Sequence, residues 1–454
     1  MLRHLSSQGG IKDAVLDDYY YNTDLDITYG SRERDMSWNI DLGAKNKVYN
    51  WYGLPIKNIF YDQPTLEGMD ATQTYNTVSL GGKLHFKKSA FSGVSMLFKR
   101  FSDAFGSGEN RFFIKPSFNV DTFGQKIKAD VIVDYVGGSF EKDFTNTSKI
   151  DYSNVIFGAK PSFLYQKDDL SVQIGAGVFY TTAKMNGVSD SKLFVYPNIK
   201  ASYKVVGDIL VAYAGAEGGL NQNSYADLVD QNTFVSPTLS ITPTDNKYDV
   251  YVGMKGKLAN TVAFNMRGSF NNEDYKALFV SNEYVLGNTN TEGYTHGNSF
   301  NVVYDNVKTI SFFGELKADF SKSVTFGING TYNNYTTDVQ AEAWNLPQLK
   351  VGTTLDFDIA PKWYAGTNIF FVGERKDVIT VQDDLLINPG TFTQQEITLD
   401  SYFDLNAHIG YKYNARLTAF LKGNNLANQQ YNRWANFPVQ GIQIMLGANY
   451  KFDF

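Results

Sequence analysis

Apolar and polar residues alternate with a period of two along most of the chain. The clearest run closes the chain, where apolar residues occupy every second position from Ile442 to Phe454. Because successive side chains of a β-strand point to opposite faces, this period predicts strands with one apolar and one polar face. Similar runs lie at 77–86, 126–135, 310–320, 324–332 and 403–413.

The connections between these runs differ in length in a regular way. Short polar turns are predicted at 165–169, 321–323 and 414–416. Long connections rich in Asn, Thr, Asp and Gly are predicted at 55–71, 142–152, 223–245, 276–306 and 378–398. We expect the two kinds to alternate strictly, which is typical of outer-membrane barrels with short periplasmic turns and long external loops.

The polar face of the predicted strands decides between a soluble and a membrane-spanning sheet. It carries Lys, Asp, Asn, Gln and Thr in strand after strand, which suits a water-filled lumen. In lipid every backbone polar group must be paired, so a spanning sheet has to close. The predicted fold is therefore all-β: one closed antiparallel transmembrane β-barrel of about 20–22 strands that occupies residues 1–454.

Composition excludes several other classes of protein. The 41 Lys and Arg against 47 Asp and Glu give a net charge of −6, which argues against nucleic acid as a partner. Cysteine is absent, which excludes disulfides and thiolate metal sites. No uninterrupted apolar segment reaches the length of about 18 residues that a transmembrane helix needs.

Aromatic residues gather near the ends of the predicted strands. We expect their rings to lie at the boundary between acyl chains and headgroups, where one part of a ring is dry and the other wet. The residues assigned to this aromatic girdle are Tyr19, Tyr20, Tyr21, Tyr29, Tyr49, Trp51, Tyr52, Trp363, Tyr364 and Tyr402.

The end of the chain carries a more specific pattern. An Asn-Leu pair and a downstream Tyr within 422–431, a Pro and Gly loop at 438–442 and the aromatic terminus at 450–454 resemble the end of TonB-dependent receptor barrels, as does the strand at 402–411. The Gly-Arg usual in that family is Gly441-Ile442 here. The resemblance implies a 22-stranded outer-membrane barrel with an N-terminal plug, which imports iron chelates, vitamins or saccharides with energy delivered by TonB.

The other end of the chain departs from that family. Strand alternation is under way by 24–29, which leaves no room for a plug, and residues 1–9 read as the outer end of a strand. We expect the sequence to begin inside a barrel and to lack its first strand or strands, since two more strands would make 22. A complete mature barrel with an unusual start is the alternative.

Candidate chemistry is sparse. His85 and His408 are predicted to face the lumen, with Asp404 on the same face as His408. Nothing places a nucleophile beside either ring, so we expect lumenal hydrogen bonds, no enzyme activity, no cofactor and no metal. The pairs Asp17-Asp18, Asp168-Asp169 and Asp383-Asp384 are expected to be solvated loop carboxylates, with an external Ca²⁺ site as the alternative.

The terminal aromatic residues have two compatible interpretations. Tyr450, Phe452 and Phe454 complete a lipid-facing stripe, and they also resemble the C-terminal signal that the barrel-assembly machinery reads. The expected partners are outer-membrane lipid, lipopolysaccharide and that machinery. TonB or another outer-membrane protein is a further candidate partner.

These features predict a protein of the outer membrane of a Gram-negative bacterium. The leading hypothesis is uptake or binding of a hydrophilic solute through the lumen and the external loops, above all 223–245, 276–306 and 378–398. One alternative is a plugless barrel that acts as a scaffold or accessory subunit of an outer-membrane complex. Another is a porin-like diffusion channel.

Overall fold

The structure is a computed structural model that describes residues 1–122, 125–285, 287–382 and 392–451. Most of these residues belong to one antiparallel sheet of 20 strands. Each strand pairs with the next along the chain from β1 to β17, and the series continues through β20, β21 and β24. Two small hairpins, β18–β19 and β22–β23, stand outside this sheet.

The strands are longest in the middle of the series. The first half comprises β1 (Leu2–Ser7), β2 (Tyr20–Arg32), β3 (Met36–Asn50), β4 (Thr72–Phe86), β5 (Phe91–Asp103), β6 (Gly108–Thr122), β7 (Gln125–Phe140), β8 (Ile150–Lys167), β9 (Leu170–Met185), β10 (Val188–Val206) and β11 (Leu210–Asn221). The second half comprises β12 (Thr244–Ala259), β13 (Val262–Ser281), β14 (Phe300–Ser321), β15 (Val324–Thr337), β16 (Leu349–Ala360), β17 (Trp363–Val372), β20 (Tyr402–Lys412), β21 (Leu417–Asn424) and β24 (Gln443–Tyr450).

The remaining elements lie in connections at one end of the sheet. They are α1 (Gln63–Gly68), α2 (Tyr225–Gln231), β18 (Arg375–Gln382), β19 (Phe392–Leu399), β22 (Asn432–Trp434) and β23 (Phe437–Pro438). Neither helix is long and apolar enough to cross a bilayer, and the same holds throughout the described residues.

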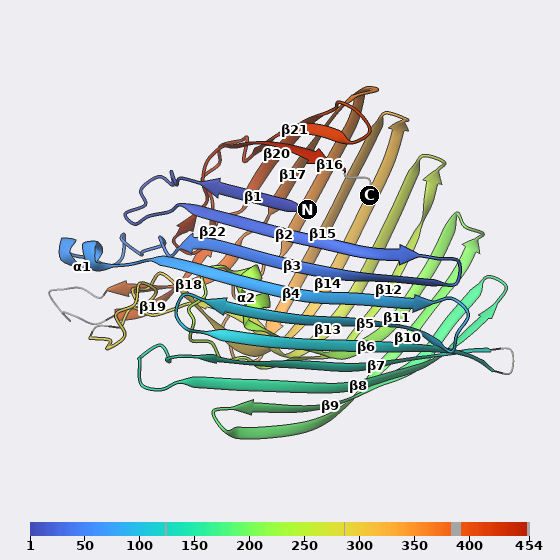
Figure 1. Cartoon of the computed structure of the whole chain (residues 1–454), viewed down its shortest axis with the longest axis horizontal. Coiled ribbons are helices and arrows are strands. Elements are labelled where there is room, and N and C mark those ends of the chain that lie inside the picture. Colours follow the sequence, from blue (N-terminus) through green and yellow to red (C-terminus); the bar gives the residue numbers. More distant parts are fainter. Residues whose placement is uncertain (123–124, 286, 383–391, 452–454) are drawn as a thin grey trace.

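The sheet curls into a barrel, with β2–β9 on the near side and β12–β17 behind them (Figure 1). The seam of the barrel lies between its first and last strands, β1 and β24. Side chains bridge the seam at the loop end, where Ser7 Oγ donates to Gln440 Oε1 at 2.8 Å and Gln443 Nε2 donates to Tyr20 Oη at 3.1 Å. In the described residues no backbone ladder joins β1 to β24.

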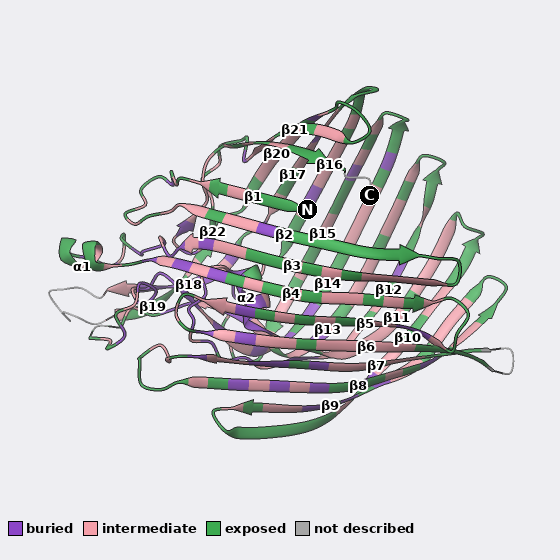
Figure 2. Ribbon diagram, viewed as in Figure 1, coloured by how far each residue is buried: buried purple, intermediate pink, exposed green. Residues whose placement is uncertain are grey.

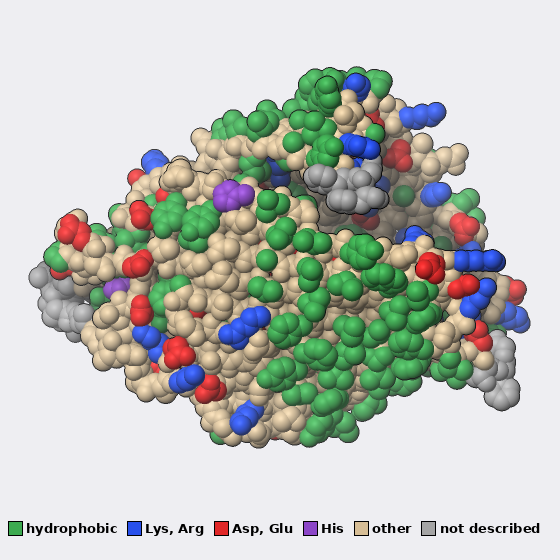
Figure 3. All heavy atoms as spheres, in the orientation of Figure 1, with side chains coloured by type: hydrophobic (Ala, Val, Ile, Leu, Met, Phe, Trp, Pro, Cys, Tyr) green, Lys and Arg blue, Asp and Glu red, His purple; other side chains and the backbone are tan. Residues whose placement is uncertain are grey.

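The two faces of the barrel wall differ as the alternation predicts. Outward positions such as Ile27, Leu42 and Leu80 are about half exposed, and apolar side chains form a broad band across the strands toward the turn end (Figure 3). Inward positions carry polar groups that bond across strands, as where Thr28 Oγ1 donates to Asp41 Oδ1. An apolar outer band around a polar interior is the arrangement of a transmembrane barrel.

The predicted alternation of short and long connections holds with two exceptions. Turns of two to four residues occupy one end, as at 168–169, 322–323 and 413–416. At the other end, two connections are also short, 104–107 and 186–187, so strict alternation was wrong. The second is an Asn-Gly turn with φ of 47° and 86°, the positive values that a tight hairpin turn requires.

Strands also extend further than the sequence indicates. The long connection predicted at 276–306 shrinks to 282–299, because β13 and β14 pair as far as Ser281 and Phe300. Buried residues collect at the loop end of the barrel rather than along the wall (Figure 2).

Candidate functional site

The connection between β11 and β12 folds into the lumen and carries α2 (Figure 1). Leu228 and Val235 of this segment are 0% exposed. They belong to a cluster that includes residues from β4, β5, β7 and β8 on one side of the barrel and from β13 and β14 on the other. The segment 222–243 therefore spans the lumen from wall to wall.

Local sequence explains why this segment forms a helix. The hydroxyl of Ser224 caps α2 by accepting a hydrogen bond from the backbone N–H of Asp227 at 3.1 Å. The carboxylate of Glu109 in β6 accepts bonds from the N–H groups of Tyr225 and Ala226 at 2.6 and 3.3 Å. A carboxylate at a helix N-terminus satisfies donors that have no partner within the helix.

Ion pairs fix the same segment to the wall. Asp227 accepts from Lys99 at 2.8 Å and from Arg111 at 2.7 Å, and Arg111 also forms a two-pronged pair with Asp134. Because removing one member of a buried pair leaves an unpaired charge, such contacts hold a loop in one position. The helix is thus fastened to the barrel at both its polar and its apolar face.

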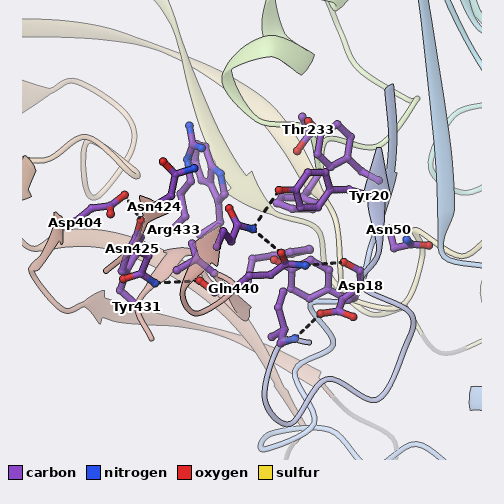
Figure 4. A pocket seen from close by; sticks show the side chains of 18 of the residues that line it. Asp18, Tyr20, Asn50, Thr233, Asp404, Asn424, Asn425, Tyr431, Arg433 and Gln440 are labelled. Carbon is purple, nitrogen blue, oxygen red and sulfur yellow. Dashed lines mark hydrogen bonds between the residues drawn. The ribbon is translucent and has the colours of Figure 1, made fainter. Parts of the chain in front are cut away.

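A cavity of about 650 Å³ lies in the lumen beside this segment (Figure 4). Asp404, Asn424 and Asn425 line one side of it, and Asn50 and Thr233 line the other. Its wall includes the end of the α2 segment and the connection that carries β22 and β23. The β1–β2 connection and parts of β2, β3, β17, β20, β21 and β24 also contribute to it.

Aromatic side chains form apolar surfaces within this polar cavity. Phe234 and Phe437 stack with ring centroids 4.0 Å apart, and Tyr52 meets Phe437 edge-on at 5.1 Å. Tyr402 stacks on Tyr431 at 3.7 Å. Burial raises the pKa of Tyr52 and of Tyr431, so both hydroxyls remain protonated donors.

The carboxylates that line the cavity have hydrogen-bond or ion-pair partners, whereas two of its cationic side chains have none among the described residues. Asp230 pairs with Lys47 at 2.7 Å, and Asp18 accepts from backbone N–H groups of its own loop. Asp404 accepts from the hydroxyl of Tyr431 at 3.2 Å. Lys422 and Arg433, by contrast, form no hydrogen bond or ion pair through their side chains with any residue that the structure describes.

The hairpin strand β18 holds the part of the wall that carries Arg433. The guanidinium of Arg375 donates to the backbone oxygens of Arg433 and Asn432 at 2.6 and 2.8 Å. The carboxylate of Asp377 accepts from the N–H of Ala435 at 3.1 Å. Burial raises the pKa of Asp377 to about 7.

Of the polar residues singled out in the sequence, some line the cavity and others lie elsewhere. Asp404 and Asp18 line the cavity, but His408 does not and instead lies near the ring of Tyr364 at 5.9 Å. His85 is exposed on a separate strand. The structure thus brings the two histidines and Asp404 into no common site. In the described residues no group of three His, Cys, Asp or Glu side chains could hold a metal ion.

Several residues assigned to the aromatic girdle lie elsewhere. Trp51 is 1% exposed and packs on Tyr294 in a loop core. Four other residues assigned to the girdle line the lumenal cavity instead: Tyr19, Tyr20, Tyr49 and Tyr52. The girdle prediction was wrong for these residues because aromatic rings at the loop end also cover the inward face. Tyr21, Tyr29 and Trp363 are exposed, as that prediction requires.

The connections proposed as hydrated external loops are largely buried. In 223–245 only Asp230, Gln231, Thr233 and Phe234 line the cavity, while Tyr225 and Leu239 are fully buried. In 276–306, Asn298 is buried and donates to the backbone of Trp51.

Some predicted positions fall outside the described residues. These are part of the 378–398 connection, including Asp383-Asp384, and the terminal residues Phe452 and Phe454. Tyr450 is 51% exposed on β24, and whether the terminus acts as an assembly signal stays a prediction.

The described strands have the fold of outer-membrane TonB-dependent receptor barrels, and solved structures with this fold include receptors and transporters. No protein-family model matches the chain, and no curated protein matches it either. Among solved structures, the ferripyoverdine receptor of the outer membrane of Pseudomonas aeruginosa aligns with TM-score 0.63 and 12% identity over 99% of this chain and 69% of that one.

Two other solved structures align similarly. The FrpB iron transporter from Neisseria meningitidis gives TM-score 0.67 and 11% identity over 96% of this chain and 72% of that one. The copper transporter OprC gives TM-score 0.62 and 12% identity over 99% and 75%. The chain thus spans about two thirds to three quarters of these proteins' lengths, and at such identities the likeness concerns the fold.

Proposed function

We propose that this barrel is an outer-membrane receptor that binds a hydrophilic solute in the lumenal cavity and serves its uptake. The observation that carries the proposal is the cavity itself: about 650 Å³, lined by amides, charged groups and stacked aromatic rings. Ligand sites of this size combine apolar surfaces with a few placed polar groups. The fold shared with iron and copper transporters supports the same proposal.

The segment 222–243 argues against a porin-like diffusion channel. It crosses the lumen and is buried against opposite walls, whereas a diffusion channel needs a continuous water-filled path. The same filled lumen is the observation that favours the second candidate function, a scaffold or accessory subunit of an outer-membrane complex.

Purified protein in detergent and in liposomes tests these alternatives. We expect no liposome swelling with arabinose, and saturable quenching of intrinsic fluorescence by at least one member of a panel of ferric chelates and oligosaccharides. Asn424→Trp, which fills the cavity, should abolish that binding. Thr354→Trp, elsewhere on the barrel wall, is the matched control and should retain it.

Each outcome distinguishes one function. Rapid swelling with arabinose would favour the diffusion channel. Closed liposomes with no binding by any member of the panel would favour the scaffold. Binding that survives Asn424→Trp would place the solute outside this cavity.

A further inference from the structure

A second cavity of about 540 Å³ lies beside the first, toward β11, β12 and β13. Asn221, Thr244, Glu273 and Lys276 contribute to its wall, together with Trp344 from the β15–β16 connection. None of these five residues lines the first cavity. The two cavities therefore occupy different sectors of the same end of the barrel.

Four residues line both cavities. They are Asp230 and Gln231 at the end of α2, and Arg433 and Trp434 of β22. We call these four residues the neck. Its α2 side is anchored to the wall through Asp227, and its β22 side is anchored through the backbone bonds from Arg375.

The fixed position of the α2 segment decides where a solute can move. Its apolar side chains are buried between opposite walls, so movement through it would require breaking a packed core. Open space beside the segment includes the two cavities, and a smaller one of about 330 Å³ at residues 240–243 shares no lining residue with either. A path between the two cavities has to run along the residues that they share.

We propose that the two cavities are successive binding sites on one solute path, that the neck separates them, and that Arg433 selects anionic solutes in both. This inference rests on the proposed uptake function and adds the route and the charge of the solute. The ligand class it names is an anion that carries a carboxylate or phosphate group.

The charge argument comes from the partners of each group. In the second cavity Glu273 pairs with Lys276, and Asp230 pairs with Lys47 across the first. Arg433 lines both cavities, and its guanidinium forms no hydrogen bond or ion pair within the described part of the chain. A guanidinium presents a planar fork of donors that matches carboxylate and phosphate oxygens.

The absence of cysteine from the sequence makes a direct test possible. Asn424→Cys reports on the first cavity and Asn221→Cys on the second. Each single-cysteine protein is reacted with two methanethiosulfonate reagents of similar size, one carrying a sulfonate and the other a trimethylammonium group. The measured quantity is the ratio of the sulfonate rate to the trimethylammonium rate.

We expect Arg433→Gln to lower this ratio about five- to tenfold at both cysteines, because one nearby charge changes the local concentration of a charged reagent by that order. Arg433→Lys should keep the ratio near its original value. Lys422→Gln is the matched control, since Lys422 lines only the first cavity, and it should lower the ratio at Asn424→Cys alone. A change with Arg433→Gln at one cysteine only, or at neither, would overturn the selectivity.

A bulky neck residue tests the route. Gln231→Trp should slow the reaction of externally added reagent at one cysteine several-fold and leave the other unchanged. Unchanged rates at both would mean that each cavity opens independently, and slowing at both would place Gln231 at a common entrance. Either result would overturn the successive sites. Because these rates need no transport, a barrel that showed the expected pattern but bound no solute would count against the proposed function alone.

Discussion

The two short helices of the loop end are alike in length and in capping, but their environments differ. α1 has six residues and α2 seven, and each begins with a side-chain cap, Asp62 for α1 and Ser224 for α2. α1 contains no buried residue, whereas four residues of α2 are buried. α1 projects beyond the loop end of the strands, whereas α2 lies within the barrel (Figure 1).

This difference shows what holds a loop inside a barrel. Helices this short are marginal in water, so neither cap alone can account for an ordered segment. α2 receives a carboxylate from β6, ion pairs from β5 and β6, and apolar contacts from both sides of the lumen. The wall, rather than the helix, supplies the stability of the closure.

Removing each helix in turn tests whether α2, and not α1, closes the lumen. Replacing residues 224–241 with a short Gly-Ser linker should leave the barrel folded and raise its single-channel conductance on the order of tenfold, because a wide barrel without filling encloses water. Replacing residues 62–69 in the same way should leave conductance unchanged. Circular dichroism checks that both variants keep their strands. Equal conductance in the two variants would show that α2 does not close the lumen.

The sequence predicts the wall far better than the closure. Alternation places strands correctly in runs such as 310–320 and 403–413, because lipid on one side and water on the other impose a strict period of two. The inward face imposes no such rule, since water, a loop or a solute can each fill it. Tyr75 continues the polar face of the run predicted at 77–86, yet it belongs to the internal core, and an aromatic residue at such a position near the loop end was the available signal of that core.

The helix itself also left a trace in the sequence. Ser224 followed three residues later by Asp227 is a helix-start pattern, and Leu228 and Val229 continue an apolar face from Tyr225. Asn186-Gly187 likewise marks the tight turn that strict alternation missed. No such pattern indicates which wall residues meet across the lumen. The shared neck of Asp230 and Arg433 brings together positions about two hundred residues apart in the chain.

One leucine in each helix allows their contributions to stability to be compared. Leu228→Ala, in the packed face of α2, should lower the free energy of unfolding by about 2–5 kcal/mol, the usual loss for a buried leucine. Leu66→Ala in α1 is the matched substitution at a half-buried position and should cost less than about 1 kcal/mol. Urea unfolding in detergent micelles measures both. Similar losses would mean that the two helices contribute alike.

A buried carboxylate extends the comparison to the other wall of the cavity. The pKa of Asp377 is raised to about 7 from its ordinary 3.8. Between these two pH values the carboxyl group is therefore protonated in the folded protein and ionised in the unfolded chain. The stability of the β18–β22 contact should therefore fall as pH rises toward 7 and stay level above it. Amide exchange of residues 375–382 and 432–438, corrected for its intrinsic pH dependence, should show on the order of a hundredfold more frequent opening at pH 8 than at pH 5, because tenfold is lost for each pH unit between 5 and 7.

Asp377→Asn supplies the control for this prediction. An amide does not titrate in this range, so the exchange of the same residues should lose its pH dependence in the variant. A pH dependence that persists in Asp377→Asn would assign it to another group.

The smallest expected difference concerns the two caps. Ser224→Ala removes the acceptor for the N–H of Asp227 inside the lumen and should lower the free energy of unfolding by about 1 kcal/mol. Asp62→Ala removes the acceptor for the N–H of Thr65, but that N–H can bond to water, so global unfolding should not change measurably. Urea unfolding compares the two variants. If Asp62→Ala proved as costly as Ser224→Ala, a cap would matter equally outside and inside the barrel, and the contrast between the helices would rest on apolar contacts alone.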